Sequence, residues 1–101
     1  MAIQIGSYNF DGPFDNTGNL RKQSGVYTIL GRNAATDRWI VMDIGESMDL
    51  QDRVMNHDRK DCWGRQRYQQ VQVGVLYCDG QARIRVEQQL RAQFNPPCGK
   101  R

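Results

Sequence analysis

Cysteine, proline and histidine are scarce in this sequence. Its three cysteines, Cys62, Cys78 and Cys98, are odd in number and widely spaced. We therefore expect core or reduced surface thiols rather than a disulfide framework. A zinc site built from these cysteines and His57 is an alternative, but the chain lacks the short Cys-x-x-Cys or His-x-x-x-His clamp that usually accompanies such sites.

Long apolar runs are also missing. No stretch approaches the roughly 18 residues that a membrane-spanning helix needs. The first residues lack the charged and apolar regions typical of a signal peptide, so we expect a cytoplasmic protein without membrane contact. With 101 residues, of which 39% are hydrophobic and 25% charged, the chain is expected to form one folded domain.

Charge is unevenly distributed along the chain. Residues 1–58 contain five Lys and Arg against eight Asp and Glu, whereas residues 59–101 contain nine against three. A basic half is compatible with a polyanionic partner such as nucleic acid, although many solvated surfaces are basic as well. The residues predicted to contact nucleic acid are Arg59, Lys60, Arg65 and Arg67.

Turn-forming residues cluster near the N-terminus, in Asp11-Gly12-Pro13 and Asn16-Thr17-Gly18-Asn19. They predict an N-terminal arm over residues 1–23, with at most one short strand at 3–8. Residues 24–101 are predicted to form the folded domain.

The rest of the chain predicts an α+β fold, in which a three-stranded antiparallel sheet is flanked by helices. Ser47 is the expected N-cap of the first helix, and Pro96-Pro97 should end the second. Residues 58–70 are expected to form a short helix or an ordered loop. The predicted strands are 25–30, 38–44 and 71–77, and the predicted helices are 48–57 and 82–94.

The first predicted helix places an arginine and a histidine near its apolar stripe. Arg53 and His57 are four residues apart, beside the stripe that Leu50 and Val54 define. Such side chains are costly to bury without partners. They are either a satisfied core histidine with an arginine that extends to solvent, or two members of a functional site.

Each of three further residues has either a structural or a functional interpretation. Glu87 is flanked at four-residue spacing by Arg83 and Arg91, which indicates surface ion pairs or a carboxylate that holds one divalent cation near phosphate. Asp43 sits at the end of an apolar strand, where aspartate is disfavoured, and either caps a turn or points a carboxylate into a site. Tyr27 is an ordinary strand aromatic unless its hydroxyl has a chemical role.

In order, these residues resemble the GIY-YIG endonuclease superfamily over roughly residues 24–99. Gly25-Val26-Tyr27 matches the first motif at a strand start, and Asp43-Ile44-Gly45 falls where the second is expected, one hairpin later. Arg53 follows Gly45 by eight residues, the spacing of the family's helix arginine, and His57 follows four later. Glu87 in the last helix and Pro96-Pro97 complete the pattern.

The resemblance implies a metal-dependent endonuclease that cleaves nucleic acid, with DNA as the expected substrate and one Mg²⁺ or Mn²⁺ as cofactor. It implies that Tyr27 lies beside the attacking water and that His57 accepts its proton. It also implies that Arg53 binds the scissile phosphate and that Glu87 holds the metal. Specificity would come from a homodimer, a partner protein or the shape of structured DNA.

Two positions depart from the family pattern. Asp43 replaces the first tyrosine of the second motif, and Gly99 stands where a terminal asparagine is expected. A carboxylate cannot donate a hydrogen bond at neutral pH as a phenol can. The site is either rebuilt, with Asp43 as a second metal ligand and catalytic residue, or impaired, which leaves a nucleic-acid-binding or protein-interaction module.

Overall fold

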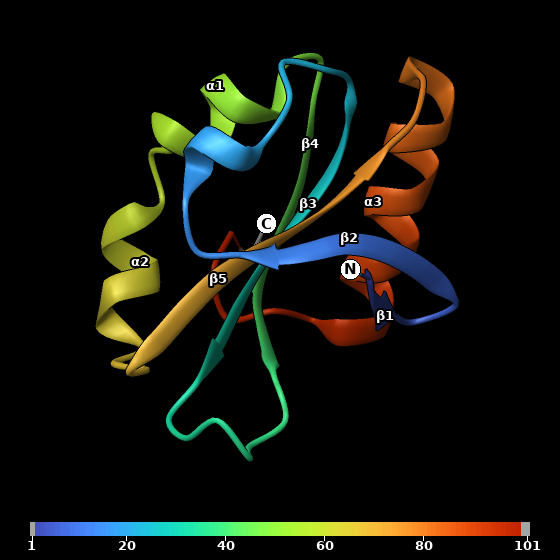
Figure 1. The fold of residues 1–101 in the computed structure, drawn as a ribbon. Coiled ribbons are helices and arrows are strands. Elements are labelled where there is room, and N and C mark those ends of the chain that lie inside the picture. The colour runs from blue at the N-terminus through green and yellow to red at the C-terminus, as the bar shows by residue number, and fades with distance from the viewer. Residues whose placement is uncertain (1, 100–101) are drawn as a thin grey trace.

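A five-stranded antiparallel sheet with helices on both faces forms the protein, as described for residues 2–99 by a computed structural model (Figure 1). The strand order is β1-β2-β5-β3-β4. The elements are β1 (Ala2–Ile5), β2 (Tyr8–Phe14), η1 (Thr17–Asn19), β3 (Gly25–Arg32), β4 (Ile40–Ser47), α1 (Leu50–Met55), α2 (Lys60–Arg65), β5 (Gln70–Tyr77) and α3 (Gly80–Phe94).

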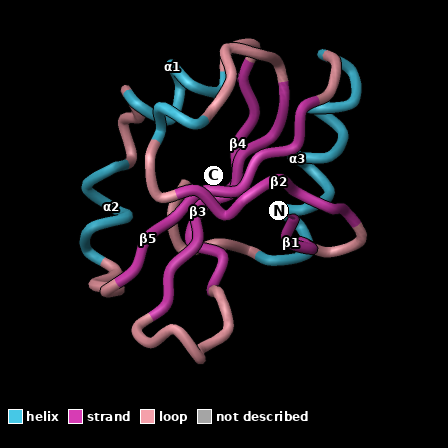
Figure 2. The backbone as a smooth tube through the Cα atoms, viewed as in Figure 1, coloured by secondary structure: helices cyan, strands magenta, loops and turns pink. Residues whose placement is uncertain are grey.

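The α+β class is as predicted, and the three predicted strands correspond to β3, β4 and β5, which are neighbours in the sheet. The loop that joins β3 to β4 projects away from the helices (Figure 2). The expected count of three strands is wrong, because β1 and β2 extend the sheet beyond β5.

Those two additional strands lie where a loop-like arm was predicted. They form a tight hairpin in which Ile5 pairs with Tyr8 and Gly6 adopts a φ of 60°. The Gly12-Pro13 pair lies inside β2, where the register with β5 shifts between Asp11 and Phe14. Glycine and proline therefore mark an irregularity within a strand here, which local composition alone does not separate from a loop.

The sheet separates two apolar clusters. Successive residues of β3 alternate between them, since Tyr27 and Ile29 face α1 and α2 whereas Val26 and Leu30 face α3. Every residue of β3 from Gly25 to Gly31 is buried. The central strand is thus covered on both faces, and its side chains are fixed by packing on either side.

The helix boundaries differ from those predicted. Asp49, not Ser47, caps α1 by accepting a hydrogen bond from the backbone of Asp52, and Ser47 ends β4. His57 therefore lies beyond α1, in the turn before α2. At the other end of the chain, α3 stops at Phe94 before the two prolines, as expected.

The expectation of reduced thiols is wrong for two of the three cysteines. Cys62 in α2 and Cys98 after α3 form a disulfide across a sequence separation of 36 residues. Folding brings these distant segments together, which the spacing of the cysteines could not show. Cys78 packs against the cluster on the α3 side, so the alternative zinc site is ruled out. Within residues 2–99, no helix has the length and apolar character to cross a bilayer.

Candidate functional site

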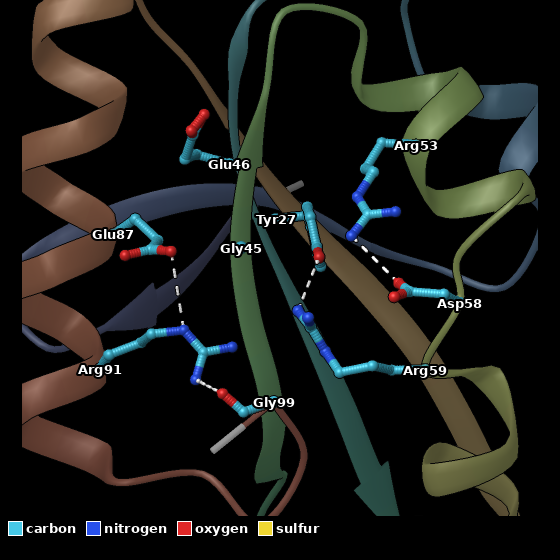
Figure 3. Close-up of a pocket in the computed structure, with 9 residues that line it drawn as sticks. All are labelled: Tyr27, Gly45, Glu46, Arg53, Asp58, Arg59, Glu87, Arg91 and Gly99. Carbon is cyan, nitrogen blue, oxygen red and sulfur yellow. Dashed lines mark hydrogen bonds and ion pairs between the residues drawn. The ribbon is translucent and has the colours of Figure 1, made fainter. Parts of the chain in front are cut away.

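A polar pocket of about 360 Å³ lies over the edge strand β4. Figure 3 shows α3 contributing side chains from one side, and α1 with the connection to α2 contributing them from the other. The lining residues are Tyr27, Gly45, Glu46, Arg53, Asp58, Arg59, Glu87, Arg91 and Gly99. Tyr27, Arg53 and Glu87, which the sequence singles out, thus share one pocket.

Tyr27 is placed by its cross-strand partner. It pairs with Gly45 in the β3–β4 ladder, and a Cβ at position 45 would clash with the Tyr27 hydroxyl. Glycine at this position therefore lets the phenol ring cross β4 and bring its oxygen to the pocket (Figure 3). In the segment Asp43-Ile44-Gly45, the glycine thus leaves the space that the ring of Tyr27 occupies.

His57 lies behind Tyr27 with its side chain fully buried. Its ring contacts those of Tyr27 and Trp63, with centroid separations of 5.3 and 4.7 Å. Burial, followed by the charges of Arg53 and Arg59, lowers the pKa of His57 from 6.5 to about 4. The imidazole is therefore neutral at physiological pH.

The hydrogen bonds of His57 assign its tautomer. Nδ1 accepts a hydrogen bond of 3.0 Å from the backbone N–H of Arg59. A neutral imidazole carries one proton, so that proton lies on Nε2, which contacts the Tyr27 hydroxyl. In this tautomer His57 donates to Tyr27, whereas the family resemblance led us to expect an acceptor.

The Tyr27 oxygen is thus surrounded by donors. Besides His57, the Nη2 group of Arg59 lies 3.3 Å away. Burial, followed by the negative charge of Asp43, nevertheless raises the pKa of Tyr27 from 10.0 to about 12. Tyr27 is therefore a phenol at neutral pH. Only its minor ionised form can accept a proton from a water that is hydrogen-bonded to its oxygen.

Arg53 extends from α1 into the pocket, where its Nη2 group lies 3.1 Å from Asp58 Oδ1 (Figure 3). The arginine side chain is 36% exposed and that of Asp58 is 73% exposed. Such an exposed ion pair contributes little to stability, so it does not hold the guanidinium against a stronger anionic ligand. A phosphate could replace the carboxylate as its partner.

Glu87 and Glu46 supply carboxylates on the α3 side of the pocket. Glu87 is 6% exposed, and its Oε2 lies 3.6 Å from Arg91 Nε. Glu46 Oε1 accepts a hydrogen bond of 3.1 Å from Arg83. A magnesium ion needs only one or two protein carboxylates when waters and phosphate complete its shell. Both carboxylates are paired with arginines here, and residues 2–99 contain no group of three or more His, Cys, Asp or Glu side chains placed to hold a metal ion.

Asp43 lies beneath the pocket and not in its lining. The side chain is fully buried, and its two oxygens accept hydrogen bonds from the backbone of Ile44 and the side chains of Arg59, Trp63 and Arg91. These donors occupy the positions that a metal ion would need. The geometry favours a structural role for the carboxylate over metal coordination.

The four residues predicted to contact nucleic acid do not act together. Arg59 lines the pocket, whereas Lys60 and Arg65 belong to α2 and Arg67 follows it. The latter three are exposed, and Lys60 donates to the backbone of Met55. None of these three side chains lines the pocket.

Sequence reasoning missed three contributors to the pocket, namely Arg91, Glu46 and Asp58. Arg91 was visible only as a neighbour of Glu87 on the helix, which suggests a surface ion pair. Its ion pair with Asp43 depends on how α3 packs beside β4. No local sequence pattern predicts how close Arg91 and Asp43 lie. Glu46 and Asp58 directly follow Gly45 and His57, so proximity to the motifs was the one available signal.

Comparison with known protein families, curated proteins and solved structures gives no significant match to this chain. Function is therefore inferred from the arrangement of these side chains.

Proposed function

We propose that this chain is a GIY-YIG-type endonuclease that hydrolyses phosphodiester bonds in DNA with the help of one Mg²⁺ or Mn²⁺ ion. One observation carries the proposal: Tyr27, Arg53 and Glu87 come from β3, α1 and α3, yet all three line the same pocket. An aromatic hydroxyl, a guanidinium and a carboxylate are the groups that metal-assisted phosphate chemistry requires.

Each group has a role that its position supports. Tyr27 orients the attacking water through its oxygen, and the water's proton passes to that oxygen when it is ionised. With a pKa of about 12 for Tyr27, roughly one site in 10⁵ is ionised at pH 7, so the rate should rise with pH. His57 and Arg59 donate to the same oxygen and hold it in place.

Arg53 and Glu87 act on the phosphate from opposite sides of the pocket. Arg53 binds the scissile phosphate and balances the charge that develops during the reaction. Glu87, with Glu46 nearby, would hold the metal ion. A bound Mg²⁺ supplies Lewis-acid stabilisation of the phosphate oxygens.

The proposal includes a cytoplasmic location, where the protein would meet its nucleic acid, although a disulfide such as Cys62–Cys98 is uncommon in that compartment. The exposed side chains of Lys60, Arg65 and Arg67 add non-specific attraction to the phosphate backbone. A pocket that grips phosphate and a metal ion contacts the nucleic-acid backbone, and such contacts carry no base information. We therefore propose a homodimer, a partner protein or recognition of structured DNA as the source of specificity.

The test is cleavage of plasmid and branched DNA by purified protein in Mg²⁺ or Mn²⁺. Glu87→Gln keeps the side-chain size and removes the charge, so cleavage should fall by at least about a hundredfold. Asp15→Asn makes the same charge change at an exposed position outside the pocket, and it should cleave like the wild type. Wild-type protein that cuts none of these substrates with any divalent metal would refute the nuclease activity.

A catalytically impaired nucleic-acid-binding module is the second candidate. The observation in its favour is Arg91, whose proximity to Glu87 already offsets the negative charge that a metal would need. This candidate predicts salt-sensitive DNA binding without turnover, weakened when Arg59, Lys60, Arg65 and Arg67 are neutralised. Binding that does not change with ionic strength would exclude it.

A further inference from the structure

The buried carboxylate of Asp43 connects the two sides of the pocket. Its Oδ2 lies 2.8 Å from Arg59 Nε, and its Oδ1 lies 2.8 Å from Arg91 Nη2. The two arginines come from different elements, since Arg59 precedes α2 and Arg91 belongs to α3. One carboxylate thus holds two like-charged guanidinium groups that would otherwise repel each other.

Each of these arginines continues to a group of the pocket. Arg59 donates through Nη2 to the Tyr27 hydroxyl at 3.3 Å. Arg91 donates through Nη1 to the carbonyl oxygen of Gly99 at 2.8 Å, and its Nε lies 3.6 Å from Glu87 (Figure 3). The hydroxyl side and the carboxylate side of the pocket are therefore positioned by the same buried charge.

Gly99 completes this arrangement. It lies between the two arginines, with a φ of 72°. A Cβ at position 99 would come within 2.5 Å of Arg91 Nη2 and 2.7 Å of Arg59 Nε. A side chain such as asparagine would therefore have to displace at least one of the two guanidinium groups that Asp43 holds. The two departures from the family pattern, at positions 43 and 99, thus meet at one place.

We infer that Asp43 is a positioning residue, which acts through Arg59 and Arg91 to hold Tyr27 and Glu87 in their working geometry. The inference rests on the proposed nuclease function for its catalytic consequence. Trp63 contributes to the same arrangement, since its indole N–H donates to Asp43 Oδ2 at 2.8 Å. We refer to Asp43, Arg59, Arg91 and Gly99 together as the arginine clamp.

The kinetic test compares Asp43→Asn with Asp15→Asn, which makes the same charge change at an exposed site. Asp43→Asn should lower kcat on the order of tenfold to a hundredfold with little change in KM for DNA, because positioning is lost and the phosphate contact of Arg53 remains. In an Arg59→Gln/Arg91→Gln background, Asp43→Asn should cause no further loss. An equal loss of kcat in both backgrounds would show that Asp43 does not act through the arginines.

A second variant covers the case in which Asp43→Asn does not fold. Gly99→Ala leaves Asp43 in place and displaces the arginines directly, so kcat should fall in the same direction. Unchanged kcat in a folded Gly99→Ala protein would overturn the inference.

A third measurement needs no cleavage activity. The Nε–Hε signal of Arg59 and the indole signal of Trp63 in NMR spectra report their bonds to Asp43. Asp43→Asn should shift both signals in the DNA-free protein, whereas Asp15→Asn should shift neither. If wild-type protein fails to cleave but the signals shift as expected, the nuclease proposal fails and the clamp stands. If the signals do not respond, the clamp itself is refuted.

Discussion

The two faces of the sheet are stabilised in different ways. On the α3 face, the core consists of aliphatic side chains with Phe10, and Thr28 is the buried polar residue that β3 sends to that side. On the other face, apolar packing is combined with the His57–Tyr27 contact, the bonds of Asp43 and a disulfide. Of the buried polar side chains, Asp43 and His57 therefore lie on the α1 and α2 face, Thr28 lies on the α3 face, and Glu87 of α3 lines the pocket beside β4.

The contrast shows that burial alone does not distinguish the face that carries the proposed site. Tyr27 and Thr28 are consecutive, and both are almost completely buried. Only the tyrosine has hydrogen-bond partners for its hydroxyl among residues 2–99. A buried hydroxyl supported by several donors indicates a specified position, whereas one without partners is compatible with simple packing.

Removal of the disulfide should change the unfolding free energy more than any other substitution that separates the two faces. The Cys62→Ser/Cys98→Ser variant should lose up to about 4 kcal/mol of unfolding free energy, because the bond closes a long loop in the unfolded chain. Cys78→Ser, on the α3 side, should lose less than about 1 kcal/mol. Urea denaturation measures both changes. Unreduced, denatured wild-type protein should show one reactive thiol, and three reactive thiols would contradict the pairing.

The next effect is on stability as a function of pH. The pKa of His57 is lowered to about 4 in the folded protein, so the unfolded chain binds the proton more readily. The contribution of the neutral His57 side chain to the unfolding free energy is therefore complete above pH 6.5. It decreases as the pH falls towards 4, by at most about 3 kcal/mol.

The chain has one histidine, so His57→Gln removes the imidazole titration and leaves that of the carboxylates. Urea denaturation of the wild type between pH 7 and pH 4 should show the decrease, and His57→Gln should show a smaller one. The same pH dependence in both proteins would mean that His57 is not the group responsible.

The smallest effect, and the sharpest comparison, uses the two neighbouring hydroxyls of β3. Tyr27→Phe should reduce DNA cleavage by about a hundredfold, the scale of losing one acid–base group. Thr28→Val removes a hydroxyl without a partner from the opposite face, so it should leave cleavage unchanged and raise the unfolding free energy by about 1 kcal/mol. Equal effects of the two substitutions on cleavage would remove the functional distinction between the faces.

The elements that were predictable from sequence are those with strong local patterns. The block β5-β3-β4 follows from runs of β-branched residues, and the end of α3 at Phe94 follows from the prolines beyond it. The β1–β2 hairpin was not predictable, because Gly12 and Pro13 favour a turn in isolation and form a strand irregularity only when β5 pairs with them.

Part of the candidate site was predictable from the sequence and part was not. The placement of Tyr27, Arg53 and Glu87 around one pocket agrees with the motif order, and their chemical roles stay predictions. The contacts of Asp43 depend on Arg59 and Arg91, which lie 16 and 48 residues away in the chain. Contacts of that range depend on how whole elements pack, so neither spacing nor periodicity contains them.

The crowding around Gly99 has an evolutionary consequence. A change at position 43 alone would leave two arginines without their shared anion, and a side chain at position 99 alone would collide with both of them. Either change by itself would disturb the arginine clamp, so we expect the two positions to covary. Lineages that descend from this chain should keep aspartate with glycine as a pair, or exchange both together.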